Sequence, residues 1–229
     1  MAFTFVPVHA AGDGAWSWHL LTDALQERGH DAVVVDLPAD DPSADLWTYA
    51  RTVVDAIGDR ENLVVVGHSF GAFTAPLVCA SVRAQSLVLV SGMIPRPGEP
   101  PADWWRKTGH ATAPRPVGAG ADDIEVYYHD VPASLAREAL ARARNHPSER
   151  ANDQPWPLDS WPDVPTHALV CRDDRLFPAD WMRGVVRDRL GIAAEELPSG
   201  HCPMLSIPDE LADRLVALAV ADGDDGARG

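Results

Sequence analysis

The stretch from Asn62 to Gly71 constrains the fold more than any other part of the chain. Its first half, residues 63–66, is apolar and rich in β-branched side chains, which is typical of a strand buried on both faces. Gly-His-Ser-Phe-Gly and then an apolar, helix-compatible segment follow. In this context the pattern Gly-x-Ser-x-Gly predicts a sharp turn that exposes Ser69 as a nucleophile at a helix N-terminus. An ordinary Gly-Ser-Gly turn is the alternative, and the flanking strand and helix disfavour it.

Strands and helices alternate on both sides of this stretch. Strands are expected at residues 3–8, 31–36, 63–66, 86–90, 166–171 and 195–197, and helices at residues 16–28, 45–57, 179–190 and 209–220. Such alternation predicts an α/β fold with a parallel sheet covered by helices on both faces. We expect residues 1–91 and 164–220 to form this core and residues 221–229 to be a flexible tail.

The alternation stops between residues 92 and 163. This region is rich in proline, has no buried strand pattern and contains one clear helical segment at residues 133–144. Its four tryptophans (Trp104, Trp105, Trp156 and Trp161) favour a packed structure over a disordered linker. A long insertion in a compact α/β domain is usually functional, so we predict a cap, or lid, over a site.

Charge and cysteine content exclude several classes of function. The chain has 229 residues, and its 34 acidic residues against 19 basic ones give a formal charge of −15, which opposes binding to nucleic acid or to an anionic membrane. No apolar stretch is long enough to span a membrane. Three scattered cysteines lack metal-ligand spacing and predict no metal site and a reduced, cytoplasmic protein. The oligomeric state stays unknown.

A serine nucleophile needs a general base and a group that orients that base. The order Ser, acid, His expected with this motif points to two loops that follow predicted strands. His201 lies in the second loop, Pro-Ser-Gly-His-Cys-Pro, and is the expected base. The first loop contains the adjacent residues Asp173 and Asp174, and the residue pattern alone does not choose between them.

Three motifs extend the argument by resemblance. The segment His-Ala-Ala-Gly-Asp-Gly-Ala-Trp from His9, the serine motif and the segment Gly-His-Cys-Pro-Met-Leu resemble those of the plant methylesterase and hydroxynitrile lyase family, within the α/β-hydrolase superfamily. The resemblance implies an α/β-hydrolase fold: a six-stranded, mostly parallel sheet in the order 2-1-3-4-5-6, with a helical cap. It also implies Asp174 as the acid, because that family commonly places it four residues before a proline, here Pro178.

The same resemblance implies an oxyanion hole, and the aromatic residues of the predicted cap indicate a substrate class. The backbone N–H groups of Phe70 and Ala11 are expected to hold the oxyanion, although Ala10 replaces the glycine usual at that position. The expected substrate is a small, mainly apolar and neutral carboxylic ester, with Trp104 and Tyr128 in the wall of the pocket and no cofactor.

Several alternative functions stay open at this stage. A lactone suits the same residues, and a binding protein or cyclase that has lost hydrolysis shares the fold. The intact set of Ser69, Asp174 and His201 argues against such a loss. The hydroxynitrile lyases carry a threonine and a lysine where this chain has Ala10 and Cys202, so lyase chemistry is disfavoured.

Overall fold

Six parallel strands form one sheet in the computed structural model, which describes residues 1–114, 116–118, 120–144 and 147–226. The strands are β1 (Thr4–Val8), β2 (Asp31–Ala32), β3 (Leu63–His68), β4 (Ala84–Val90), β5 (Thr166–Cys171) and β6 (Glu195–Leu197). Their spatial order is β2-β1-β3-β4-β5-β6, as the resemblance implied, and every pairing is parallel. The central strand β3 pairs with β1 and β4, which places the serine motif in the middle of the sheet.

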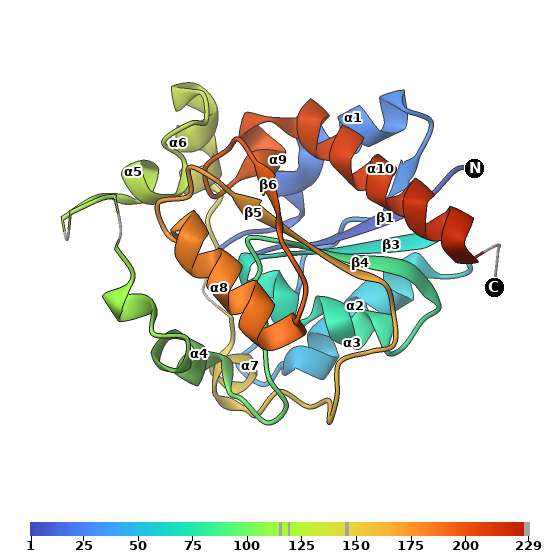
Figure 1. The fold of residues 1–229 in the computed structure, drawn as a ribbon, viewed down its shortest axis with the longest axis horizontal. Helices are drawn as coiled ribbons and strands as arrows, with labels where there is room; N and C mark the ends of the chain where they lie inside the picture. The colour runs from blue at the N-terminus through green and yellow to red at the C-terminus, as the bar shows by residue number, and fades with distance from the viewer. Residues whose placement is uncertain (115, 119, 145–146, 227–229) are drawn as a thin grey trace.

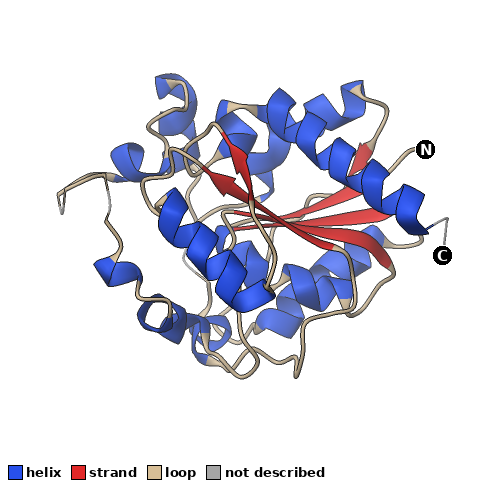
Figure 2. Ribbon diagram, viewed as in Figure 1, coloured by secondary structure: helices blue, strands red, loops and turns tan. Residues whose placement is uncertain are grey.

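Apolar side chains alternate between the two faces of the sheet, and each face is covered by helices (Figures 1 and 2). Val64 and Val66 belong to one core cluster with residues of α1 (His19–Glu27) and α10 (Pro208–Gly226). Val65 belongs to the other cluster with residues of α2 (Leu46–Ile57), α3 (Ala75–Cys79) and α8 (Ala179–Leu190). A strand buried on both faces explains why residues 63–66 are uniformly apolar.

Strand β2 is much shorter than the strand predicted at residues 31–36. Its pairing with β1 ends at the partners Phe5 and Ala32, apart from one bond from the Val33 N–H to the Phe5 carbonyl oxygen at 2.8 Å. The chain then leaves the sheet edge, and the Leu37 N–H donates to Nε2 of His9 at 3.0 Å. The imidazole of His9 therefore accepts a backbone N–H from this segment, and the strand pairing predicted for residues 31–36 stops early.

The flexible tail predicted from residue 221 overlaps the end of α10. Helix α10 continues to Gly226, and residues 227–229 lie outside the described part. Asp222 accepts a hydrogen bond from Nε2 of His167 on β5 at 2.9 Å. This contact and one from Gln85 to the Ala219 carbonyl oxygen fasten the helix end to the sheet, which composition did not reveal.

The described residues of the insertion form short helices joined by loops, without a strand. It contains α4 (Pro101–Lys107), η3 (His110–Thr112), α5 (Asp123–Tyr127), α6 (Ala133–Ala141) and α7 (Glu149–Asp153). These helices lie together at one end of the sheet, on the side to which the arrows of β5 and β6 point (Figure 2). Ligands in open α/β sheets bind at these carboxyl ends of the strands.

Buried polar contacts fasten the insertion to the core. The indole N–H of Trp156 donates to the Phe73 carbonyl oxygen at 2.9 Å. Glu99 and Arg189 of α8 form an ion pair whose side chains are almost fully buried. In the described residues no helix combines the length and apolar character needed to cross a membrane.

Candidate active site

The serine motif forms a strained turn between β3 and η2 (Ser69–Phe73), which leads into α3. Ser69 has φ +47°, in the left-handed region that a residue with a side chain rarely adopts. A Cβ on Gly67 would lie 2.9 Å from the Ala75 Cβ, and one on Gly71 would lie 2.8 Å from the His9 carbonyl oxygen. Both glycines are therefore required by close packing. The turn enters a 3₁₀ helix first, and the α-helix begins only at Ala75.

Asp174 and His201 meet at the carboxyl ends of β5 and β6. Nδ1 of His201 lies 2.8 Å from Oδ2 of Asp174, while Oδ1 accepts the N–H groups of Leu176 at 2.8 Å and Phe177 at 2.9 Å. Burial alone would raise the pKa of Asp174, but the charge of His201 and these hydrogen bonds hold that pKa below its usual value. Asp174 is therefore a buried carboxylate that orients the imidazole.

Asp173, the neighbouring candidate, faces solvent. Its carboxylate forms an ion pair with Arg172 at 3.0 Å, and its side chain is 48% exposed. This placement separates the two aspartates that the residue pattern could not distinguish.

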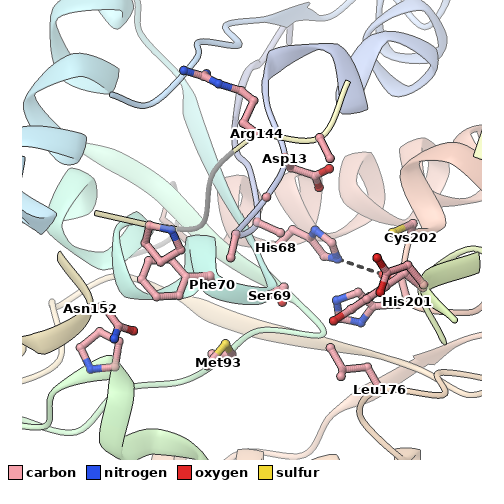
Figure 3. Close-up of a pocket in the computed structure, with 18 of the residues that line it drawn as sticks. Asp13, His68, Ser69, Phe70, Met93, Arg144, Asn152, Leu176, His201 and Cys202 are labelled. Carbon is pink, nitrogen blue, oxygen red and sulfur yellow. Dashed lines mark hydrogen bonds between the residues drawn. The ribbon is translucent and has the colours of Figure 1, made fainter. Parts of the chain in front are cut away.

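His68, the variable residue of the serine motif, supports the loop of His201. Its Nε2 lies 2.9 Å from the carbonyl oxygen of His201, and the centres of the two rings are 4.9 Å apart (Figure 3). Because a carbonyl oxygen only accepts, Nε2 of His68 carries the proton. Burial first, and then the charge of His201, lower the pKa of His68 to about 3, so its ring is neutral.

The loop after β1 brings Ala11 to the same place. His9 is buried beneath this loop; its Nδ1–H donates to the Ala10 carbonyl oxygen at 2.9 Å, and its Nε2 accepts the Leu37 N–H. These two bonds fix the loop and leave His9 no part in the chemistry. Ala11 and Phe70 both line the cavity next to Ser69, and the Phe70 N–H lies in the first turn of η2, where amide groups lack partners within the helix.

A cavity of about 570 Å³ contains Ser69 and His201 in its wall. The predicted wall residue Tyr128 also lines it. Trp104 does not: its side chain is fully buried and packs on Phe177 and Trp181, whereas the next residue, Trp105, lines the cavity. Successive residues of a helix point about 100° apart, so the sequence identified the correct helix but not which tryptophan faces the cavity.

The sequence reading missed two groups at this site. Asp13, two residues after Ala11, lines the cavity, and no motif had marked it as functional. Asp130 of the insertion accepts the Gly200 N–H at 2.6 Å and the Ser199 hydroxyl at 3.1 Å, directly before His201. Both contacts of Asp130 join residues about 70 positions apart in the chain, so local patterns carry no signal for them.

Comparison with known proteins identifies the family of this chain. A model of the alpha/beta hydrolase family matches residues 6–214. The chain belongs to this family. The hydrolase is 24% identical to methylesterase 7 of Arabidopsis thaliana, over 94% of this chain and 95% of that protein. It is also 24% identical to norfluorocurarine synthase 1 of a Strychnos species, over 94% of both chains.

A solved structure shares the fold of this hydrolase. The crystal structure of polyneuridine aldehyde esterase superposes with a TM-score of 0.80 at 20% identity, over 96% of this chain and all of that chain. The sheet order and the family match therefore confirm the predicted α/β-hydrolase fold. In this hydrolase a strained serine, a buried imidazole–carboxylate pair and two loops with backbone N–H groups meet at one cavity, which suits nucleophilic attack on a carbonyl group.

Proposed function

We propose that the protein hydrolyses carboxylic esters through Ser69, His201 and Asp174. The observation that carries this proposal is the 2.8 Å contact between Asp174 and His201, buried beside the strained Ser69 in one cavity. A methylesterase and an esterase among the similar proteins support the same chemistry.

The reaction proceeds through an acyl-enzyme. Ser69 Oγ attacks the ester carbonyl carbon while Nε2 of His201 accepts the hydroxyl proton, and the backbone N–H groups of Phe70 and Ala11 stabilise the oxyanion. The C–O bond to the alcohol then breaks, and His201 returns the proton to the leaving oxygen. Water, deprotonated by His201, attacks the acyl-enzyme and releases the carboxylic acid and free Ser69. Asp174 keeps Nδ1–H of the imidazole oriented throughout.

The residues next to the triad disfavour the hydroxynitrile lyase alternative. Cys202 lines the cavity directly after His201, at the position where the hydroxynitrile lyases carry a lysine. Burial, together with the charges of Asp13 and Asp174, raises the pKa of its thiol well above the usual value. A neutral thiol cannot stabilise a departing cyanide anion as an ammonium group does. A lactone, being a cyclic ester, stays within the proposed reaction.

We also propose that residues 92–163 form a cap that closes the cavity. Pro101, Trp105, Tyr127 and Leu140 of this region line the cavity, so the insertion supplies much of its apolar wall. This lining and the apolar side chains of Phe70, Met93 and Leu176 support a small substrate with an apolar acyl group.

A fluorophosphonate probe tests the proposed function. We expect one covalent adduct, located on Ser69 by mass spectrometry, and hydrolysis of p-nitrophenyl butyrate that is lost in Ser69→Ala. The control is Ser81→Ala, which removes the hydroxyl of a serine after α3 whose side chain bonds only to the Leu77 carbonyl oxygen. An adduct on another residue, or hydrolysis that survives Ser69→Ala, contradicts the proposal.

A further inference from the structure

Asp13 is an acidic side chain in the catalytic cavity that the proposed mechanism does not use. It follows Gly12 in the loop that carries Ala11, and it lines the cavity together with His201 and Cys202. Its carboxyl group accepts a hydrogen bond from the Ser17 hydroxyl, and the charge of His201 acts on it. Burial raises the pKa of Asp13 to about 6, so at the usual assay pH of 8 the group is a carboxylate.

No described basic side chain forms an ion pair with this carboxylate. Arg144 also lines the cavity, but its guanidinium group binds Asp36 at 3.1 Å and Asp40 at 2.8 Å. In Figure 3 that group points away from Ser69. Arg142, which lines a neighbouring cavity with Asp13, pairs with Glu138 at 2.9 Å. Asp13 is partly exposed to the cavity, so a bound cation can reach its carboxylate and form an ion pair that is stronger there than at the protein surface.

The position of Asp13 in the cavity indicates which part of a bound ester lies beside it. Figure 3 shows Asp13, Cys202 and His201 on one side of Ser69, and Phe70 and Met93 on the other. His201 returns a proton to the leaving oxygen, so the alcohol lies on the side of His201 and Asp13. The acyl group then lies against Phe70 and Met93, which are apolar.

We propose that Asp13 recognises a positively charged amine on the alcohol part of the ester. The assignment rests on the proposed ester hydrolysis, since the side of the leaving alcohol follows from that reaction. Tyr128 also lines the cavity and lies within the electrostatic reach of Asp13, and an aromatic ring near the carboxylate favours an alkylammonium group. The preferred substrate is then an amino-alcohol ester with an apolar acyl group, in contrast to the neutral substrate expected from the sequence.

Two esters of the same shape isolate the effect of the charge. Butyrylcholine and 3,3-dimethylbutyl butyrate differ only in a quaternary nitrogen against a quaternary carbon. We expect kcat/KM to be about tenfold higher for butyrylcholine, because an ion pair in a partly desolvated cavity is stronger than an ion pair at the protein surface. In Asp13→Asn this preference should fall by about tenfold. Asp55→Asn, which removes the same charge from the exposed face of α2, should keep it.

A binding measurement tests the affinity of the Asp13 subsite for a cation without turnover. Calorimetry on Ser69→Ala should show choline binding more tightly than 3,3-dimethylbutanol, with the difference lost in the double variant that also carries Asp13→Asn. Equal kcat/KM for the two esters, or a preference that survives Asp13→Asn, overturns the inference while leaving ester hydrolysis intact. If neither ester is cleaved, the proposed function fails, and the calorimetric comparison alone then supports or overturns the cation subsite.

Discussion

At the scale of single residues, the strongest test of the site compares two adjacent aspartates. Asp174 is buried and bonds to His201, whereas Asp173 pairs with Arg172 at the surface. Asp174→Asn should lower kcat by about 10⁴, because the amide can present its N–H to Nδ1 and so hold the imidazole in the wrong tautomer. Asp173→Asn should change kcat by less than about twofold, because exposed ion pairs contribute little. Steady-state kinetics on p-nitrophenyl butyrate measures both, and the reverse ranking would move the acid to Asp173.

The two tryptophans of α4 show where single-residue prediction ends. A tryptophan-rich helix beside a site is expected to pack inward. Trp104 and Trp105 are the same residue type, so composition does not show which of them faces the cavity. The choice between them depends on how α4 is rotated, which follows from the bond between Trp104 and Ile94 and from the packing of Trp104 on Phe177. These contacts are tertiary, so the sequence supports the helix and leaves its orientation open.

At the scale of elements, the segment from Glu125 to Asp130 joins the cap to both catalytic loops. Nε2 of His129 lies 2.9 Å from the Asp173 carbonyl oxygen, and Asp130 binds the Gly200 N–H and the Ser199 hydroxyl. A Cβ on Gly200 would lie 2.7 Å from Nε2 of His129, so a glycine before His201 is needed for this contact. The insertion therefore contacts the residues next to Asp174 and His201 as well as lining the cavity.

Asp130→Ala should show that this contact positions His201. Removing the carboxylate leaves the Gly200 N–H without its acceptor, although the Ser199 hydroxyl keeps its contact with Ser206 Oγ at 2.8 Å, so the histidine loop loses part of its outer support. We expect kcat to fall by about tenfold or more with KM nearly unchanged, and Asp130→Asn, which keeps one acceptor oxygen, to recover part of the loss. Glu138→Ala removes an exposed cap carboxylate that pairs with Arg142 and serves as the matched control. A loss of thermal stability with normal kcat in Asp130→Ala would make the contact structural only.

At the scale of the whole molecule, the sequence predicted the parts that depend on local patterns. The buried strand at residues 63–66, the turn at Ser69 and the order of the catalytic loops follow from β-branched runs, glycines and spacing, and the order of the strands came from the resemblance. The contact from Asp222 near the end of α10 to His167 spans 55 residues, so local patterns do not reveal it. Asp13 was missed for a different reason: an acidic residue in a loop has no distinctive pattern, and only the cavity gives it a role.

Buried neutral histidines connect the site to the stability of the whole protein. His68 has a folded pKa of about 3 against 6.5 when exposed, so between these values the unfolded chain binds a proton that the folded protein does not. Its contribution to the free energy of unfolding is therefore complete above pH 6.5 and decreases as the pH falls, by about 1.4 kcal/mol per pH unit. Asp13 acts in the opposite sense below pH 6, because its folded pKa is raised, whereas His9, whose pKa burial lowers, acts in the same sense as His68.

Comparing the protein with His68→Gln isolates the histidine, because Asp13 and His9 are present in both. Glutamine keeps a donor for the His201 carbonyl oxygen but does not titrate. Urea unfolding at pH 7.5 and pH 5 should show the wild-type protein losing about 2 kcal/mol more than the variant over this interval, since about 1.5 pH units of it lie below 6.5. Parallel losses in the two proteins would mean that His68 takes up a proton in the folded state. Its ring would then be charged beside His201, and its hydrogen bond to the His201 carbonyl oxygen would be charge-assisted rather than neutral.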